Sequence, residues 1–377
     1  MRRGLRVLLL WALVLLVLMI GGAAVAEQTP SCTITVQPGE SIQAAIDAAP
    51  EGAVICLPAG EWQAELRISK SLTLRGAGAP RTTIRGKSLD GPVVQVHRPA
   101  SLVAVEDLTV TGAKGEGAGH GIIVNDAVVV TVSRCVISSN AVHGVVLIDR
   151  SQGIISDSTI QDNLKNGVVT YHNAHALIID SAVSHNGWSG VTVEKDAEAD
   201  VASCTISNNG AATGGMDSGI VVVDNARATI TACAIFENRI LGIAVRGPGQ
   251  AVITGCSISK TKGAATGGDG IQLMLSAHAT INGCTIFENG RHGIVLKDTA
   301  EADIESCRIF LNGSYGLALV ERPCFAMDAV FAGRAAGREN AIPSPTEPDG
   351  NKLGAVCPGA LAFLMTPEGG ELDRRPH

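Results

Sequence analysis

The sequence predicts an all-β solenoid, a parallel β-helix in which each coil is formed by one short repeat. Three observations support this prediction: a glycine that recurs at a near-constant spacing, apolar residues that alternate after each glycine, and a shortage of large rings. Of the 377 residues, 46% are hydrophobic but only 3% are aromatic. A core of stacked Val, Ile, Leu and Ala suits thin repeated layers better than a single globular core.

The repeat is clearest in residues 218–238, SGIVVVDNARATITACAIFEN. Positions one and three after the glycine are apolar and are expected to point inward. A small residue and then an asparagine follow at fixed distances. A period of 23 residues, with two intervals of 29 and 28, is typical of one coil of a parallel β-helix. The anchor glycines are Gly121, Gly144, Gly167, Gly190, Gly219, Gly242, Gly270, Gly293 and Gly316.

The first 26 residues predict a secretory signal peptide. Three arginines precede an apolar run over residues 7–20, and Ala24-Val25-Ala26 fits cleavage before Glu27. An uncleaved anchor is the alternative, although the run is short for a membrane span. Without the three arginines, the formal net charge of −7 becomes −10, which argues against nucleic acid as a partner. We expect a secreted protein, periplasmic or extracellular.

The remaining chain divides into three predicted regions. Residues 27–322 form the β-helix, with a short N-terminal capping helix over residues 41–49. Residues 323–365 form a C-terminal flap that caps the last coil, and residues 366–377 form a disordered tail. Two disulfide bonds are expected in an oxidising compartment, Cys32 with Cys56 and Cys324 with Cys357.

The unit Gly-Ile-x-Val…Ala-x-Ile-x-x-Cys/Ser-x-Ile-x-x-Asn resembles the repeat of right-handed parallel β-helix proteins, the pectin-lyase-like superfamily. The stretch SIQAAIDAAPEGAVICLPAGEW resembles the capping helix and first coils of the same proteins. The resemblance implies a right-handed parallel β-helix. It leaves the activity open, because that superfamily includes pectate lyases, polygalacturonases, epimerases, copper-processing periplasmic proteins and non-catalytic surface proteins.

Motifs of particular members of that superfamily are absent. Gly119-His120-Gly121 is similar to a tripeptide of polygalacturonases, but the Asp-Asp and Asn-x-Asp motifs that accompany it there do not occur. His143 and His292 also precede anchor glycines, so we interpret the tripeptide as coincidence. The Arg-x-Pro-x-x-Arg pattern of pectate lyases and the Asp-Pro-His-Asp pattern of alginate epimerases are missing too.

A column of cysteines has two interpretations. Cysteine recurs on five consecutive coils, which could form a metal-binding thiol ladder. The alternative is a small core residue, which we favour because metal ligands converge from different directions and serine takes the same position in other coils. No metal site is predicted here. The column contains Cys135, Ser158, Ser181, Cys204, Cys233, Cys256, Cys284 and Cys307.

Two inserted loops mark the candidate site. Residues 210–215 and 263–268 both read Gly-Ala-Ala-Thr-Gly-Gly, and Asp217 and Asp269 follow them. Loops that project from one edge of a rigid solenoid commonly carry function. As catalytic residues, the two aspartates could form an inverting carboxylate pair, or could hold a cation while Arg239 removes a proton from a uronic acid. The alternative is a duplicated loop whose charges are merely solvated.

Five further residues lie just before anchor glycines and form the predicted substrate-binding set. A sugar site needs a ring for stacking and polar groups that fix hydroxyls. The set combines both kinds of side chain: Lys165, Trp188, Arg291, His292 and Tyr315.

The leading prediction is a secreted β-helix that binds or processes an extracellular polysaccharide; as an enzyme it would be a polysaccharide lyase or a glycoside hydrolase. A second hypothesis is a structural or adhesion solenoid that docks a protein partner on an apolar strand face. A third is a periplasmic metal-handling accessory protein, which the lack of a Met or His cluster disfavours. No cofactor is expected, although Asp126 and Asp149 could hold Ca²⁺ at a turn. The apolar outward positions are Ile123, Val146, Ile148, Val169, Tyr171, Val221, Val223 and Val295.

Overall fold

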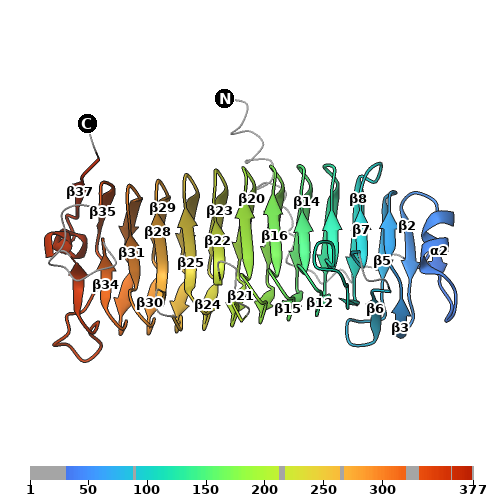
Figure 1. The fold of residues 1–377 in the computed structure, drawn as a ribbon, viewed down its shortest axis with the longest axis horizontal. Helices are drawn as coiled ribbons and strands as arrows, with labels where there is room; N and C mark the ends of the chain where they lie inside the picture. The colour runs from blue at the N-terminus through green and yellow to red at the C-terminus, as the bar shows by residue number, and fades with distance from the viewer. Residues whose placement is uncertain are drawn as a thin grey trace, which may run out of the picture. The chain divides into compact units, whose positions relative to one another are not determined.

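The computed structural model describes residues 31–87, 91–211, 217–263, 267–319, 331–357 and 359–375. The chain divides into two units, residues 1–32 and 33–377. The second unit is a parallel β-helix whose coils follow one another in a row from α2 (Ile42–Ala48) to β37 (Gly370–Asp373) (Figure 1). The predicted signal peptide lies outside the described residues. Within the described ranges, no helix is long and apolar enough to cross a bilayer.

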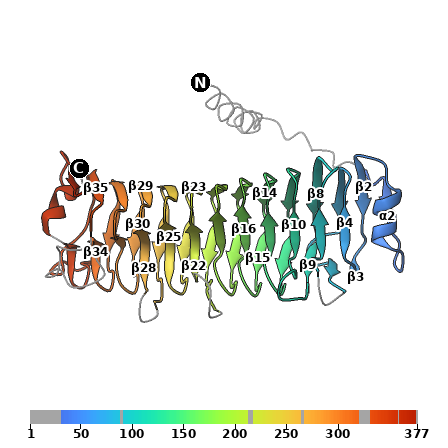
Figure 2. The same cartoon turned by 45° about the horizontal axis from the view of Figure 1, so that its top comes forward.

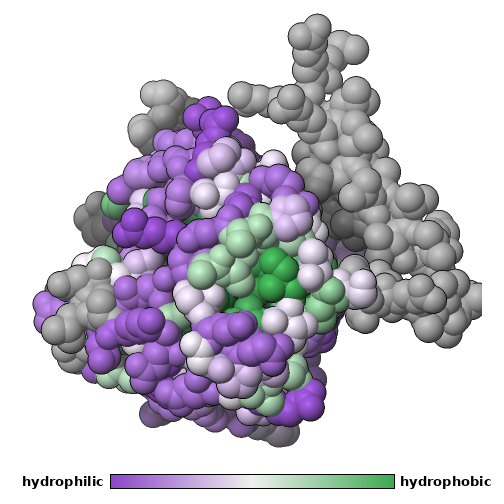
Figure 3. All heavy atoms as spheres, turned by 90° about the vertical axis from the view of Figure 1, so that its right-hand side faces the viewer, coloured by the Kyte–Doolittle hydropathy of each residue, from purple (hydrophilic) through white to green (hydrophobic). Residues whose placement is uncertain are grey.

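The predicted capping helix is confirmed as α2. The Ser41 hydroxyl accepts a hydrogen bond from the Ala44 backbone N–H at 3.2 Å, which caps the first turn. Ile42 and Ile46 face the first coil and are buried. Figure 3 looks onto the end that carries this helix and shows one apolar area surrounded by hydrophilic side chains. The helix thus covers an end of the stack that would otherwise expose core.

Three sheets run along the stack, and every third strand of the repeat joins the same sheet. Sheet A contains, in spatial order, β1 (Ile34–Thr35), β2 (Ala53–Cys56), β5 (Leu72–Arg75), β8 (Leu102–Glu106), β11 (Val129–Ser133), β14 (Gln152–Ser156), β17 (His175–Ile179), β20 (Glu198–Ala202), β23 (Arg227–Thr231), β26 (Gln250–Thr254), β29 (His278–Asn282), β32 (Glu301–Glu305), β35 (Arg334–Arg338) and β37. Sheet B contains β3 (Gly60–Gln63), β6 (Thr82–Arg85), β9 (Thr109–Thr111), β12 (Val136–Ser138), β15 (Thr159–Gln161), β18 (Ala182–Ser184), β21 (Thr205–Ser207), β24 (Ala234–Phe236), β27 (Ser257–Ser259), β30 (Thr285–Phe287) and β33 (Arg308–Phe310).

Sheet C holds the strands that follow the anchor glycines, and it carries the candidate site. Figure 2 shows β22, β25 and β28 among its neighbouring strands. Its members are β4 (Leu66–Ile68), β7 (Val94–Val96), β10 (Ile122–Val124), β13 (Val145–Leu147), β16 (Val168–Tyr171), β19 (Val191–Glu194), β22 (Ser218–Val222), β25 (Leu241–Arg246), β28 (Asp269–Met274), β31 (Ile294–Leu296), β34 (Tyr315–Ala318) and β36 (Gly354–Cys357).

The register stacks equivalent residues directly on one another. Ile220 pairs with Ile243, and Val222 pairs with Val245, in parallel strands. All four side chains are fully buried. The predicted inward positions are therefore confirmed, and each fully buried aliphatic side chain contributes about 1.5–3 kcal/mol through its removal from water.

Close approach between coils explains the anchor glycines. A Cβ atom on Gly219 would lie 2.6 Å from the Gly242 carbonyl oxygen and 2.8 Å from the Asn238 amide nitrogen. The asparagine column forms the predicted ladder, in which the Asn209 side chain donates to the Asn238 side-chain oxygen at 3.0 Å. Equivalent bonds join Asn140 to Asn163, Asn163 to Asn186, Asn186 to Asn209 and Asn289 to Asn312.

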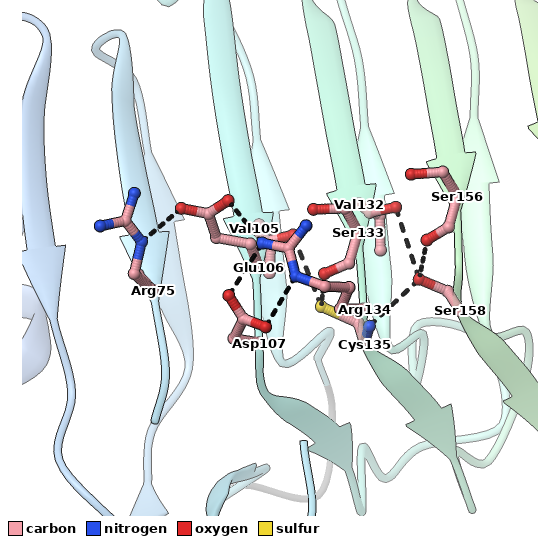
Figure 4. A network of polar contacts seen from close by, with 10 residues as sticks. All are labelled: Arg75, Val105, Glu106, Asp107, Val132, Ser133, Arg134, Cys135, Ser156 and Ser158. Carbon is pink, nitrogen blue, oxygen red and sulfur yellow. Dashed lines mark hydrogen bonds and ion pairs between the residues drawn. The ribbon is translucent and has the colours of Figure 1, made fainter. Parts of the chain in front are cut away.

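The cysteine column lies in the core. Cys135 Sγ donates to the carbonyl oxygens of Val105 and Ser133 at 3.4 and 3.3 Å, and the Ser158 hydroxyl donates to Ser156 O at 2.7 Å (Figure 4). Burial raises the pKa of the Cys135 thiol to about 12. Thiol and hydroxyl thus serve the same purpose, as small donors to core carbonyls. The described free cysteines are Cys135, Cys204, Cys233, Cys256, Cys284 and Cys307.

An ion-pair network joins the early coils at the corner between sheets A and B. The Arg134 guanidinium contacts Asp107 Oδ1 at 2.8 Å and Glu106 Oε2 at 3.2 Å, while Arg75 Nε contacts Glu106 Oε1 at 2.5 Å (Figure 4). Because Arg75 and Glu106 are largely buried, this network is worth more than an exposed pair.

Three of the four cysteines expected in disulfides are disulfide-bonded: Cys32, Cys56 and Cys357. Cys324 lies outside the described residues, so the bridge expected between Cys324 and Cys357 stays a prediction.

The coil pattern continues beyond residue 322, which corrects the predicted flap. β35 pairs in parallel with β32, and β36 pairs in parallel with β34. Asn340 Oδ1 accepts from the Cys307 N–H at 2.9 Å, and Asn351 Oδ1 accepts from the Asn312 side chain at 2.9 Å. Residues 331–357 therefore form a further coil rather than a flap. The repeat pattern does not reveal this coil, because 39 residues rather than the usual 23 separate Asn312 from Asn351.

The predicted disorder of residues 366–377 is wrong where β37 forms. β37 pairs with β35 in the antiparallel sense. Arg334 lies between two strands' carboxylates, 2.7 Å from Glu371 Oε1 and 2.8 Å from Asp303 Oδ1. Leu361 and Leu364, on the 3-10 helix η2 (Gly359–Met365), are fully buried against the core. Glu371 and Asp373 of the tail pair with arginines, and β37 covers the edge of β35.

Candidate functional site

The predicted site residues gather along one edge of sheet C, where each coil passes from sheet B into sheet C. We call this row, the two residues before each anchor glycine from Gly119 to Tyr315, the glycine edge. The register of β22, β25 and β28 aligns Ser218, Leu241 and Asp269 across three coils. The residues directly before the glycines are His120, His143, Asn166, Ser189, Ser218, Leu241, Asp269, His292 and Tyr315.

Polar side chains directly before the glycines accept hydrogen bonds from the backbone of the next coil. The Asn166 N–H donates to His143 Nδ1 at 3.1 Å, and the Tyr315 N–H donates to His292 Nδ1 at 3.4 Å. Asn166 Oδ1 accepts from the Ser189 N–H at 2.9 Å in the same way. Since Nδ1 accepts in both histidines, each imidazole is neutral and carries its hydrogen on Nε2.

Four side chains at the N-terminal part of the glycine edge form an aromatic cluster, His120, His143, Lys165 and Trp188. The two imidazole rings stack with centroids 5.3 Å apart, and the His143 ring meets the Trp188 ring edge-on at 6.4 Å. Lys165 Nζ lies 4.9 Å from the centroid of the Trp188 ring. Burial, reinforced by Lys165, lowers the pKa of His120 to about 4 and, together with His120, that of His143 to about 3. At neutral pH the cluster therefore carries one positive charge, on Lys165.

Asp217 and Arg239 form a pair in the middle of the edge. Arg239 Nη1 lies 3.5 Å from Asp217 Oδ2 and donates to the Gly210 carbonyl oxygen at 3.2 Å. The Asp217 side chain is only 5% exposed, whereas that of Arg239 is 39% exposed. Asp217 also adopts a left-handed backbone conformation with φ of 37°. The insert of residues 210–215 is described only at its first two residues, Gly210 and Ala211.

Asp269 is the most constrained carboxylate of the edge. Two nitrogens of the Arg291 guanidinium bind it: Nε donates to Oδ1 at 2.8 Å and Nη2 donates to Oδ2 at 2.5 Å. The Gln272 amide donates to Oδ2 at 3.1 Å and the His292 N–H to Oδ1 at 3.2 Å. The Asp269 side chain is fully buried, and the His292 ring stacks on Tyr315 at 5.9 Å. The carboxylate therefore fixes the positions of Arg291 and His292.

This geometry bears on the three predicted catalytic residues. Asp217 and Asp269 lie two coils apart, about 10 Å by strand spacing. Both carboxylates are buried and bound to an arginine, which leaves little room for contact with a substrate. Arg239 is a poor base because a guanidinium keeps its proton in proteins. The arrangement favours a positioning role for all three, and their catalytic role stays a prediction.

Sequence reasoning missed two charged residues on the outward face of sheet C. Glu194 and Arg246 end β19 and β25, in the same outward row as Tyr171. Burial and the nearby Asp224 raise the pKa of Glu194, and burial lowers the pKa of Arg246. Lys195 Nζ lies 5.4 Å from the Tyr171 ring. The sequence did contain a signal for these two residues, because each is a charged residue in a row of the repeat that is otherwise largely apolar.

The expected apolar docking face on sheet C is not exposed. Val221 and Ala244 are fully buried and pack with Leu241 and Ile240 of the glycine edge. Val295 is likewise buried in a cluster with Tyr315 and other side chains. The outward positions that the sequence suggested as a docking face are therefore covered, and that prediction is wrong for the valines: Val146, Val169, Val221, Val223 and Val295.

The turn aspartates considered for Ca²⁺ lie at the opposite edge of sheet C. Asp126 and Asp149 both adopt left-handed conformations and line an open hollow of about 640 Å³ with Arg98, Arg150 and His172. His172 Nδ1 lies 3.6 Å from Asp149 Oδ1. In the described part of the chain, no three His, Cys, Asp or Glu side chains are grouped as a metal ion would require.

A family model described as "Right handed beta helix region" matches residues 98–258 and 212–324. Together the two matches span more than half of the chain and include the whole glycine edge. The sheets show a parallel β-helix, and the matching family model specifies that its coil is right-handed. The predicted right-handed parallel β-helix is therefore confirmed.

Solved structures share the fold at low sequence identity. The A-module of the mannuronan C-5 epimerase AlgE4 of Azotobacter vinelandii is 19% identical, with a TM-score of 0.58 over 83% of this chain and 95% of that one. The A-module of AlgE6 of the same organism is 17% identical, with a TM-score of 0.59 over 84% and 93%. The catalytic domain of a GH87 alpha-1,3-glucanase variant in complex with tetrasaccharides is 13% identical, with a TM-score of 0.53 over 91% and 68%. These likenesses establish the fold alone. Comparison with curated proteins finds no relative.

Proposed function

The chain belongs to the family of right-handed beta-helix proteins, and on this fold we propose that it binds a polysaccharide outside the cytoplasm. The binding surface is the glycine edge together with the partly exposed outward residues Tyr171, Glu194 and Arg246 of sheet C. Lys165, Trp188 and Tyr315 supply contacts to sugar rings, and Arg291 and His292 are held in place by Asp269.

The continuity of the glycine edge is the observation that carries this proposal. Polar or aromatic side chains occupy it on eight of its nine coils, from His120 to Tyr315, and the coil with Ile240 and Leu241 is the exception. At ~4.8 Å per coil the row extends over roughly 38 Å, which suits an extended polymer better than a small ligand. The Trp188 ring beside the Lys165 ammonium offers an apolar face with a charged donor next to it.

Two further observations support the proposal. Disulfide-bonded Cys32, Cys56 and Cys357 fit an oxidising compartment outside the cytoplasm, as does the predicted signal peptide. Proteins of the same fold include, by their names, mannuronan epimerases and a glucanase bound to tetrasaccharides. They provide a precedent for saccharide chemistry on such a scaffold.

A second candidate function, cleavage of the bound polymer as a glycoside hydrolase or polysaccharide lyase, is favoured by Glu194. A partly buried carboxyl with a raised pKa, on the face beside the glycine edge, has the property that a general acid needs. Asp217 and Asp269 would then position neighbouring groups. Appearance of reducing ends or unsaturated products, and their loss in Glu194→Gln with binding retained, would establish this activity.

The test of binding uses a panel of uronans and neutral glycans with Trp188→Ala. We expect about tenfold weaker binding, because stacking of this kind contributes about 1–1.5 kcal/mol. Phe310→Ala is the matched control, since Phe310 also carries a cation over its ring, Arg308 at 4.3 Å, but lies in sheet B. The proposal would be contradicted if the wild-type protein bound no glycan of the panel, or if both variants lost the same amount of affinity.

A further inference from the structure

We infer that Arg246, on the outward face of sheet C, binds an oxyanion of the polysaccharide, either a uronate carboxylate or a sulfate ester. The inference rests on the proposed function and deepens it, because it assigns the ligand to the anionic glycans and names the residue that recognises the charge.

The position of Arg246 follows from the register of β25. Ile243 and Val245 point inward and are fully buried, so Ala244 and Arg246 point outward. Arg246 pairs with Met274 of the next coil, and Ala244 pairs with Val221 and Gln272. Its neighbours Val221, Ala244 and Gln272 are buried, whereas Arg246 itself is partly exposed. A ligand group can therefore reach the guanidinium from outside the sheet.

The state of the guanidinium is unusual for a buried cation. Its Nε atom is buried and has no hydrogen-bond partner, and the residue is partly buried as a whole. Burial alone lowers its pKa, with no neighbouring carboxylate to offset the effect. By contrast, Arg291 on the glycine edge and Arg239 next to it are each paired with an aspartate. Arg246 is therefore a cation of this surface for which the described residues provide no paired carboxylate.

Two carboxylates lie on the same side of sheet C, Asp224 in the turn one coil earlier and Glu194, but neither offsets the effect of burial on the pKa of Arg246. Glu194 occupies the same outward row two coils away, about 10 Å by strand spacing, with Val223 between them. Removing an arginine from water without a partner destabilises a protein, and residues retained in that state mark functional sites. The missing partner is an anion that arrives with the ligand.

The chemistry of the guanidinium selects the kind of anion. Its planar fork matches the two oxygens of a carboxylate or of a sulfate, and such charge-assisted bonds strengthen where water is excluded. Arg246 ends β25 at the edge of sheet C opposite the glycine edge, about 17 Å along the strand from Leu241, so a glycan that runs from the glycine edge across β25 would bring a charged substituent to this point. The Lys165 ammonium, three coils earlier, provides a second positive charge along the same path.

The experiment compares wild type, Arg246→Met, Arg246→Lys and the control Arg227→Met. Arg227 is exposed on sheet A and pairs with Glu198 at 3.6 Å, so its loss changes the net charge equally on another face. The ligands are a uronan oligosaccharide, a sulfated glycan and a neutral glucan, each titrated by calorimetry. Thermal unfolding of all four proteins is recorded without ligand.

We expect Arg246→Met to weaken binding of one anionic ligand about tenfold or more, since a charge-assisted pair is lost, and to change binding of the neutral glucan by less than about threefold. Whichever anionic ligand loses affinity identifies the oxyanion as carboxylate or sulfate. Arg246→Lys should recover part of the affinity, and Arg246→Met should unfold at the same or a higher temperature than wild type, because an unpaired cation has been removed.

Unchanged binding of both anionic ligands in Arg246→Met would overturn the inference, as would an equal loss in Arg227→Met. Strong destabilisation of Arg246→Met would also overturn it, since the side chain would then serve the fold. These outcomes are distinct from failure of the proposed function, in which no glycan binds wild type or Trp188→Ala fails to weaken binding.

Discussion

At the scale of single residues, the histidines before the anchor glycines have a backbone role. His143 Nδ1 accepts the N–H of Asn166, as Asn166 Oδ1 accepts the N–H of Ser189 one coil later. The sequence could show that His recurs in this column, and the interpretation of Gly119-His120-Gly121 as coincidence agrees with the role of His143. It could not show the acceptor role, because the bond joins residues 23 apart and depends on the ring's orientation.

The neutral state of His143 makes a prediction about pH. Its pKa is lowered to about 3 in the folded protein, so the unfolded chain binds a proton between pH 6.5 and about 3 that the folded chain does not. Stability is therefore fully present above pH 6.5 and falls as the pH decreases. His143→Asn keeps an acceptor in the column and removes this proton uptake. Between pH 6 and 4, the free energy of unfolding of the variant should decrease less steeply with falling pH than that of the wild type. We expect the two slopes to differ by about 1 kcal/mol per pH unit.

Chemical denaturation at several pH values measures this difference. His185→Asn, at an exposed turn of the following coil, controls for the loss of one histidine. Parallel pH profiles for wild type and His143→Asn would show that His143 is not held neutral by the fold.

At the scale of the strand and coil, regular spacing decided what could be predicted. The capping helix, the inward positions and the asparagine ladder all follow from a fixed period, since each coil repeats the environment of the last. The coil over residues 331–357 could not be predicted in this way. Its ladder residue, Asn351, stands 39 residues beyond Asn312 rather than 23, although it makes the same bond.

Replacement of an anchor glycine should lower the free energy of unfolding strongly for a single added carbon atom. Gly219→Ala places a Cβ atom 2.6 Å from the Gly242 carbonyl oxygen, so two coils must separate or the backbone must shift. We expect a loss of about 1–3 kcal/mol in the free energy of unfolding, as for overpacked cores. Gly117→Ala is the control, because nothing lies within 4 Å of the position that its Cβ atom would take. Equal stability of the two variants, measured by denaturant unfolding, would contradict this account of the anchor.

At the scale of the whole molecule, the sequence grouped the candidate residues along one edge but did not show how their charges pair. Trp188, Arg291 and Tyr315 share a row because each lies at the same point of its coil, which the alignment of repeats makes visible. The pairing of Asp269 with Arg291 depends on side-chain direction across coils, and Arg246 lies in a strand position that the repeat marks only as outward. Repetition therefore locates a site, while side-chain packing decides which of its charges remain available to a ligand.

The end of the stack provides a test on this same scale. A solenoid gains stability from contacts between neighbouring coils and needs its ends covered. Ending the chain after residue 365 removes β37 and the Arg334–Glu371 contact, so we expect a soluble protein that unfolds a few degrees lower. Ending it after residue 330 also removes β35 and β36, which exposes the strand edges of β32 and β34 and buried Leu317 and Ile309. That shorter chain should aggregate, as seen by size-exclusion chromatography and thermal unfolding. If it were as soluble and stable as the full chain, residues 331–357 would not be the coil that closes the stack.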